Sequence, residues 1–130
     1  MSEFSYNDTK LIRVKKNVPH CLIEYAKDVE NQVEISKLVE AVFNGAYSSE
    51  LFDSAQIKTR ALAFEHYMVG NRKSDFIHVT LSILSGRTNE QKAQLSMLVL
   101  SQLKSLSLQA TSLTVDVRDL DRASYAKAIV

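Results

Sequence analysis

The sequence predicts an α+β domain built from a doubled β-α-β unit, with a four-stranded sheet and two helices on one of its faces. Three observations predict it. Segments that alternate apolar and polar residues indicate strands, and apolar residues spaced by three and four indicate helices. The order strand, helix, strand then occurs twice, over 19–69 and again from residue 75 onward. Because such crossovers are right-handed, both helices should cover the same face of the sheet.

The first half opens with a strand at 19–26, in which Cys21, Ile23 and Tyr25 alternate with His20, Leu22 and Glu24. A helix follows, with an apolar stripe formed by Ile35, Leu38, Val39, Val42, Phe43 and Ala46. We expect Asn31 to cap this helix, with Glu34 three residues later, and Gly45 and the Ser48-Ser49 pair to mark its end. Residues 56–69 are predicted to form one long strand, and 70–74 a polar turn.

The second half repeats this order. Residues 75–84 alternate, with Ile77, Val79, Leu81 and Ile83 on one face. Thr88 and Gln91 have the spacing of a capping box, and they open a helix with the stripe Leu95, Leu98, Val99, Leu103 and Leu106. A last strand is predicted around Leu113, Val115 and Val117.

The second face of this sheet should be mostly polar: it carries Glu24, His78, Thr80, Ser82, Thr114, Asp116 and Arg118. Two interpretations stay open. The face is exposed to solvent, or the faces of several copies meet in a small symmetric oligomer. Phe64, Tyr67 and Met68 on the long strand favour the second interpretation.

Composition excludes several classes of protein. The 130 residues are 45% hydrophobic and 24% charged, which is typical of a folded domain. A net charge of +1 gives no general electrostatic attraction to nucleic acid. No apolar run approaches the ~20 residues that span a bilayer, so no membrane partner is expected. The single cysteine and the absence of a signal-like apolar start favour the cytoplasm.

Residues 1–18 lack the periodicity of the rest, so we divide the chain into an N-terminal extension, 1–18, and a single domain, 19–130. Two interpretations of the extension stay open. It is a loose terminal tail, or it is not part of the native protein and Val18 marks an alternative start codon. The distinction matters because Pro19 would then be N-terminal. An internal proline nitrogen is an amide, whereas a terminal one is a basic amine that titrates near ~8 before its surroundings act.

Several sequence features together resemble the 5-carboxymethyl-2-hydroxymuconate Δ-isomerase family of the tautomerase superfamily. They are Pro19-His20 at the start of the first strand, Ile57-Lys58-Thr59-Arg60, and Phe76-Ile77-His78-Val79-Thr80-Leu81 running into Ser85-Gly86-Arg87. The resemblance covers residues 19–121. It implies a tautomerase-like fold, a homotrimer with active sites between subunits, and no metal or organic cofactor.

The resemblance also implies an activity in the breakdown of homoprotocatechuate, an aromatic compound. An N-terminal proline acts as general base in this family, so Pro19 would move a proton along an unsaturated 2-hydroxy polycarboxylic acid. Such a small-molecule substrate carries several negative charges, which cations must offset. The candidates are Arg87, before the second helix, and Arg60 and Lys58, on one strand face. Family members carry arginine at the position of Lys58, so the substrate preference of this chain stays open.

Other residues carry weaker signals. His20, His66 and His78 are expected on strands, at separations that match no metal motif. Cys21 alternates with apolar residues and is expected to be a buried small hydrophobe. If the extension stays attached, the alternative is a non-catalytic binding or regulatory module, because the same element order occurs in ferredoxin-like domains.

Overall fold

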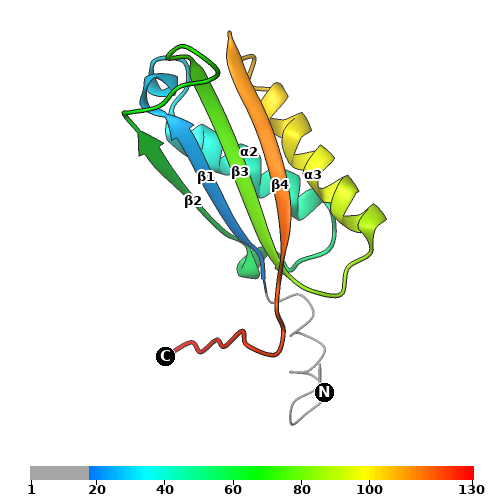
Figure 1. Cartoon of the computed structure of the whole chain (residues 1–130). Coiled ribbons are helices and arrows are strands. Elements are labelled where there is room, and N and C mark those ends of the chain that lie inside the picture. The colour runs from blue at the N-terminus through cyan, green and yellow to red at the C-terminus, as the bar shows by residue number, and fades with distance from the viewer. Residues whose placement is uncertain (1–17) are drawn as a thin grey trace.

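The computed structural model describes residues 18–130, and it confirms the α+β architecture with a four-stranded sheet and two helices (Figure 1). The sheet has the order β2-β1-β3-β4. Its strands are β1 (His20–Ala26), β2 (Lys58–Phe64), β3 (Asp75–Leu84) and β4 (Thr111–Leu120). The helices are α2 (Ile35–Ser48) and α3 (Asn89–Lys104), with 3-10 turns η1 (Lys27–Asn31) and η2 (Ser54–Gln56). Residues 1–17 lie outside the described part, so of the predicted extension, 1–18, the structure describes only Val18.

The direction of the strands brings four chain segments to one end of the sheet. β1 runs parallel to β2, and β3 runs parallel to β4. The two pairs join through antiparallel β1 and β3, where His20 lies opposite Ser82. The starts of β1 and β2 therefore meet the ends of β3 and β4. We call this the Pro19 end of the sheet.

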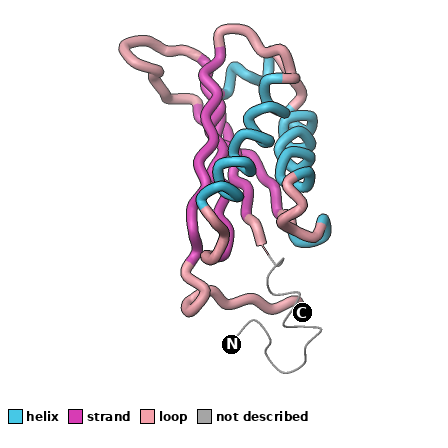
Figure 2. The backbone as a smooth tube through the Cα atoms, turned by 90° about the vertical axis from the view of Figure 1, so that its right-hand side faces the viewer, coloured by secondary structure: helices cyan, strands magenta, loops and turns pink. Residues whose placement is uncertain are grey.

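Both helices cover one face of the sheet, as predicted, and the core lies between the helices and the sheet (Figure 2). The strands contribute every second residue to this core, including Cys21, Ile23, Val79 and Leu81, which are all fully buried. The helices contribute Leu38, Val42, Leu95 and Val99. The predicted apolar stripes are thus the faces that pack.

The two helix starts differ in how they are capped. The capping box predicted before α3 is confirmed, because the Thr88 hydroxyl accepts from the Gln91 N–H at 3.1 Å and the Gln91 side chain accepts from the Thr88 N–H at 2.9 Å. The predicted cap of the first helix is wrong. Asn31 ends the 3-10 turn η1, and Glu34 is the residue before α2, without a side-chain cap. The intervening turn displaces the helix start by several residues.

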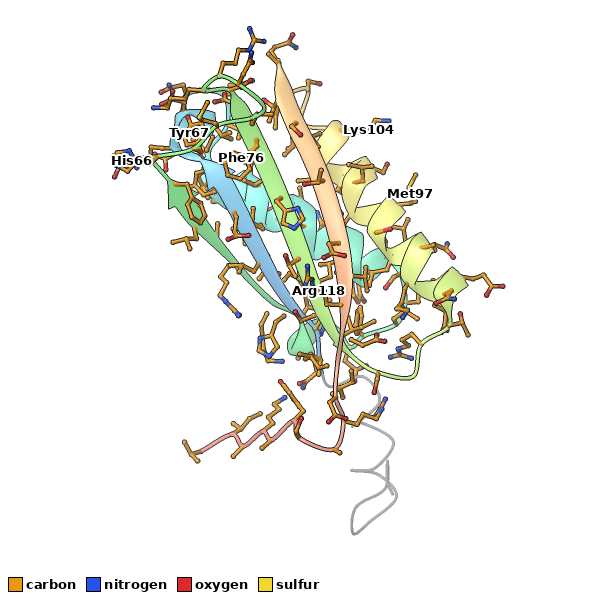
Figure 3. The ribbon with its side chains drawn as sticks, viewed as in Figure 1. His66, Tyr67, Phe76, Met97, Lys104 and Arg118 are labelled. Carbon is orange, nitrogen blue, oxygen red and sulfur yellow. The ribbon has the colours of Figure 1, made fainter. Side chains whose placement is uncertain are left out.

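The single long strand predicted over 56–69 is also wrong. β2 ends at Phe64, and Tyr67 and Met68 lie in the connection to β3. Tyr67 packs edge-on against Phe76 of β3, with ring centroids 5.6 Å apart, and the Lys73 ammonium lies 5.0 Å from the centre of its ring (Figure 3). These contacts turn the chain back toward the sheet, so tertiary packing overrides the local strand pattern.

The outer face of the sheet carries the polar residues that the alternation predicted. His78 Nδ1 and the Thr114 hydroxyl are 2.6 Å apart across β3 and β4, and Arg118 Nε donates to Asp116 at 2.7 Å. Apolar side chains also lie on this face: Leu62 is 52% exposed. In this single chain the face is a mixed polar and apolar surface.

The main core cluster lies within the domain that begins at Pro19. Every buried residue of the core cluster lies between Cys21 and Leu103, and the residues packed against it extend to Val117. A chain that begins at Pro19 therefore loses the buried side chain of Val18 but keeps the whole core cluster and all four strands, and we expect it to fold on its own. Among residues 18–130, no helix is long and apolar enough to cross a membrane.

Gly45 marks the closest approach of the two helices and generates a prediction. A Cβ at this position would lie 2.7 Å from the Val99 Cα of α3. Glycine to alanine inside a helix normally stabilises by about 1 kcal/mol. Here we expect Gly45→Ala to destabilise the protein by about 1–2 kcal/mol, because overpacking outweighs that gain.

Chemical denaturation measures this effect directly. Asn44→Ala, at the neighbouring exposed position of the same helix, is the control and should raise the free energy of unfolding by up to about 0.7 kcal/mol, from helix propensity alone. A higher stability of Gly45→Ala would contradict the close helix contact.

Candidate active site at the Pro19 end of the sheet

Pro19 lies directly before β1, inside the folded domain. It is buried, and the preceding Val18 is only 2% exposed. The Pro19 carbonyl accepts the Lys58 N–H at 3.0 Å, which extends the β1–β2 pairing by one residue beyond His20 and Lys58. Proline is tolerated here because the first position of a strand requires no N–H. This places Pro19 beside the first residue of β2.

Lys58 and Arg60 lie on the same face of β2, as their spacing predicted. Their strand partners are His20 and Leu22, which belong to the outer face of β1. Arg60 Nη1 donates to His20 Nδ1 at 3.3 Å, and Lys58 Nζ donates to the Gln56 carbonyl at 2.7 Å. The structure therefore brings two of the three predicted cations next to the residue that follows Pro19.

His20 is held as a neutral ring by this arrangement. An arginine can only donate, so Nδ1 must be the acceptor, and the proton of the neutral ring lies on Nε2. Nε2 then donates to the Tyr125 hydroxyl at 2.9 Å. Burial lowers the pKa of His20 below 6.5, and the nearby charges of Lys58, Arg60 and Lys127 lower it further. All the charged groups that act on this ring are cations.

Lys58 is subject to the same surroundings. Its pKa is lowered, first by partial burial and then by the charge of Lys127, while Cys21 acts weakly in the opposite direction. An ammonium held in a crowded, partly buried group of cations is stabilised when an anion binds. The Pro19 end of the outer face is therefore suited to negatively charged ligands.

Arg87, the third predicted cation, lies at the same end of the sheet but makes different contacts. It follows β3 and is half-buried. Its Nη2 donates to the Leu51 carbonyl at 2.8 Å, and its guanidinium lies 5.8 Å from the centre of the Phe52 ring. Leu51 and Phe52 belong to the segment between α2 and β2. Within one chain these contacts direct Arg87 toward that segment, whereas Arg60 contacts His20.

Sequence reasoning missed three residues that complete this group: Gln56, Tyr125 and Lys127. Tyr125 and Lys127 lie after the last strand, where no periodicity identifies them. Lys127 Nζ donates to Gln56 Oε1, so both ammonium groups of Lys58 and Lys127 are bound to the same glutamine. The available signal was topological: β4 must end where β1 begins, so the segment after it had to pass near Pro19.

Cys21 and the histidines, which carry weaker signals in the sequence, also have defined positions in the structure. Cys21 points into the core, and burial raises the pKa of its thiol to about 11. His78 contacts Thr114 on the outer face, and His66, which was expected on a strand, lies in the connection after β2. Among residues 18–130, no cluster of three or more histidine, cysteine, aspartate or glutamate side chains could hold a metal ion.

Comparison with known proteins agrees with this architecture. The doubled β-α-β unit, with its four-stranded mixed sheet and two helices, is a tautomerase-like fold. The model of the family described as 5-carboxymethyl-2-hydroxymuconate isomerase matches residues 19–128, and the chain belongs to this family. No curated protein matches the chain.

Solved structures with the same fold include three that are informative. A 5-carboxymethyl-2-hydroxymuconate isomerase from Deinococcus radiodurans R1 is 19% identical, with a TM-score of 0.75 over 87% of this chain and 90% of that one. Pt0534 inactivated by 2-oxo-3-pentynoate is 16% identical, with a TM-score of 0.73 over 84% and 91%. A wild-type fused 4-OT, described as a symmetric trimer, is 18% identical, with a TM-score of 0.68 over 84% and 91%.

The position of His20 predicts how stability depends on pH. Because the pKa of His20 is lowered in the folded chain, the two states bind a proton at different pH. The unfolded chain binds it as the pH falls through about 6.5, and the folded chain binds it only at lower pH. We therefore expect the free energy of unfolding to fall as the pH drops from about 6.5 toward the pKa of folded His20.

Denaturation curves at several pH values between 7.5 and 5 measure this dependence. His20→Gln should flatten it in that interval, because the group that titrates there is gone. The same replacement at exposed His66 controls for the loss of a histidine as such. An unchanged slope in His20→Gln would contradict the neutral, cation-surrounded ring.

Proposed function

We propose that this chain, when it begins at Pro19, is a cofactor-free isomerase for 5-carboxymethyl-2-hydroxymuconate or a closely similar unsaturated 2-hydroxy polycarboxylic acid. Pro19 is the general base, and Lys58, Arg60 and Arg87 bind the substrate. The reaction belongs to the cytoplasmic breakdown of homoprotocatechuate. The observation that carries the proposal is the group of cations beside Pro19, in a chain of the isomerase family.

The chemistry requires a base and nothing redox-active. The Pro19 nitrogen takes the proton of the 2-hydroxyl group, the electrons of the O–H bond form a carbonyl, and the double bonds shift along the conjugated chain. The proton then returns from Pro19 to a carbon further along, so substrate and product have the same composition. Burial and neighbouring cations both lower the pKa of an amine, which keeps the free base available near neutral pH.

The cations have a second role in this reaction. The intermediate is a dienolate, which adds a negative charge to a molecule that already carries several carboxylates. Lys58 pairs with His20, next to Pro19, and Arg60 contacts the His20 ring, so both cations would lie near that charge. Fixed cations stabilise such a charge without reorganisation. Lysine offers a compact ammonium in place of the two-pronged guanidinium, so position 58 favours a different carboxylate geometry from that of its relatives.

Arg87 fits the proposal best if several chains assemble. Within one chain it bonds to Leu51, away from Arg60, and a solved structural relative is described as a symmetric trimer. We propose a homotrimer in which the mixed outer face, including the 52% exposed Leu62, lies between subunits. Sedimentation equilibrium should give three times the chain mass, and a monomer at all concentrations would contradict this assembly.

The proposal depends on a free amine at Pro19. With Val18 attached, the nitrogen is an amide enclosed in the fold, because Val18 is 2% exposed. The alternative is then a non-catalytic ferredoxin-like binding or regulatory module. The two functions predict different behaviour for two forms of the chain, one full-length and one that begins at Pro19.

Turnover is the first test. We expect the chain that begins at Pro19 to isomerise 5-carboxymethyl-2-hydroxymuconate roughly 10²–10⁴ times faster than the full-length chain, which is the typical contribution of general base catalysis. Its rate should decline at low pH as the amine becomes protonated. Pro19→Ala in the same form should lower kcat. Full activity of Pro19→Ala, or equal rates of the two forms, would overturn Pro19 as the base.

A covalent probe tests the amine without turnover. A secondary amine adds to the activated triple bond of 2-oxo-3-pentynoate: the nitrogen forms a bond to carbon, a proton goes to the neighbouring carbon, and nothing leaves. We expect the chain that begins at Pro19 to gain the mass of one reagent molecule on its N-terminal peptide. The thiol of Cys21 stays protonated and buried and should not react. Equal labelling of the full-length chain would contradict the assignment.

A further inference from the structure

The C-terminal segment, residues 121–130, crosses the Pro19 end of the sheet from β4 toward β2 (Figure 1). Its first turn is fixed by local bonds. Asp121 accepts the Ala123 N–H at 3.2 Å with its side chain and the Tyr125 N–H at 3.1 Å with its carbonyl. Arg122 Nε donates to the Ser85 carbonyl at 2.7 Å, which ties the turn to the end of β3. The direction of the segment is therefore set by the folded domain.

Two further contacts attach the segment to the candidate active site. The Tyr125 hydroxyl accepts the Nε2 proton of His20 at 2.9 Å, with the two rings edge-on at 6.1 Å. Two residues later, Lys127 Nζ donates to Gln56 Oε1. The backbone carbonyl of the same Gln56 accepts a hydrogen bond from Lys58 Nζ. The ammonium groups of Lys58 and Lys127 are thus held on one neutral residue.

These contacts arrange the cations as a row along the edge of the sheet. Arg60 lies beside Leu22, Lys58 beside His20, and Lys127 at Gln56, beyond the start of β2. The charge of Lys127 is close enough to lower the pKa of both His20 and Lys58. Like charges repel at this range, so a ligand with several negative charges gains most by binding along the row.

We infer that Lys127 is a specificity-determining residue, which binds a carboxylate of the substrate other than the one next to the reacting enol. This inference rests on the proposed function and extends it to the substrate class. In the register of β1 and β2, Pro19 is level with Ile57, between Lys58 and the Gln56 that holds Lys127. Lys58 and Arg60 lie on one side of Pro19 and bind the carboxylate next to the enol. Lys127 lies on the other side of Pro19, at Gln56, where it would select substrates with a third carboxylate over those with two.

Kinetics with two substrates test the assignment in the chain that begins at Pro19. One substrate is 5-carboxymethyl-2-hydroxymuconate, and the other is 2-hydroxymuconate, which lacks the carboxymethyl group. We expect Lys127→Gln to raise KM about tenfold for the first, as for the loss of one charge-assisted hydrogen bond, with kcat little changed. KM for the second should change by less than about twofold.

Matched variants keep the test specific. Lys127→Arg retains the charge and should restore most of the affinity for the tricarboxylate. Lys104→Gln removes a lysine at the end of α3, at the opposite end of the domain, and should leave both substrates unaffected (Figure 3). Equal loss for both substrates in Lys127→Gln, or no loss for either, would overturn the specificity role.

Binding separates this inference from the proposed reaction. Calorimetry with propane-1,2,3-tricarboxylate and glutarate, neither of which can isomerise, measures the anion preference directly. We expect Lys127→Gln to weaken binding of the tricarboxylate about tenfold and that of glutarate much less. Tricarboxylate binding that depends on Lys127, in a protein without turnover, would overturn the reaction but support Lys127 as an anion ligand. Turnover combined with unchanged binding of both the tricarboxylate and glutarate in Lys127→Gln would support the reaction but overturn Lys127 as an anion ligand.

Discussion

The antiparallel pairing of β1 with β3 is the constraint on which the rest of the molecule depends. It joins two parallel strand pairs so that the first strand of one unit starts where both strands of the other unit end. Residues that are far apart in the chain therefore converge at a single end of the sheet. A shift of one residue in this register would turn His20 toward the helices and Cys21 outward. The buried face of β1, formed by Cys21, Ile23 and Tyr25, prevents such a shift.

Much of the fold could be predicted because its strands and helices are locally consistent. β3 alternates from Asp75 to Leu84 and forms a strand with those bounds, and the box of Thr88 and Gln91 starts α3 as expected. The errors arose where contacts between distant residues compete with local preference. Asn31 is part of the 3-10 turn η1 and so cannot cap α2. Tyr67 lies outside β2 and packs on Phe76. Neither the turn nor the ring contact produces a periodic pattern in the sequence.

The candidate site was predictable only in part, for a similar reason. Lys58 and Arg60 could be placed on one face because alternation fixes which side of a strand a residue occupies. The contact of His20 with Tyr125 spans 105 positions and involves a segment without periodicity. For Arg87, the sequence indicates the loop before α3, but the direction of its side chain depends on Leu51 and Phe52. Long flexible side chains acquire a direction only from the fold around them.

The burial of Val18 and Pro19 bears on when a free amine could arise. The peptide bond between them lies between two buried residues, and Pro19 is already paired with Lys58 through its carbonyl. A protease must bind its substrate as an exposed, extended segment, and nicking concentrates where chains offer one. The folded domain does not offer this bond. If Pro19 works as a base, its nitrogen is therefore freed at the start of translation or by trimming of the nascent chain, and folding then positions an amine that already exists.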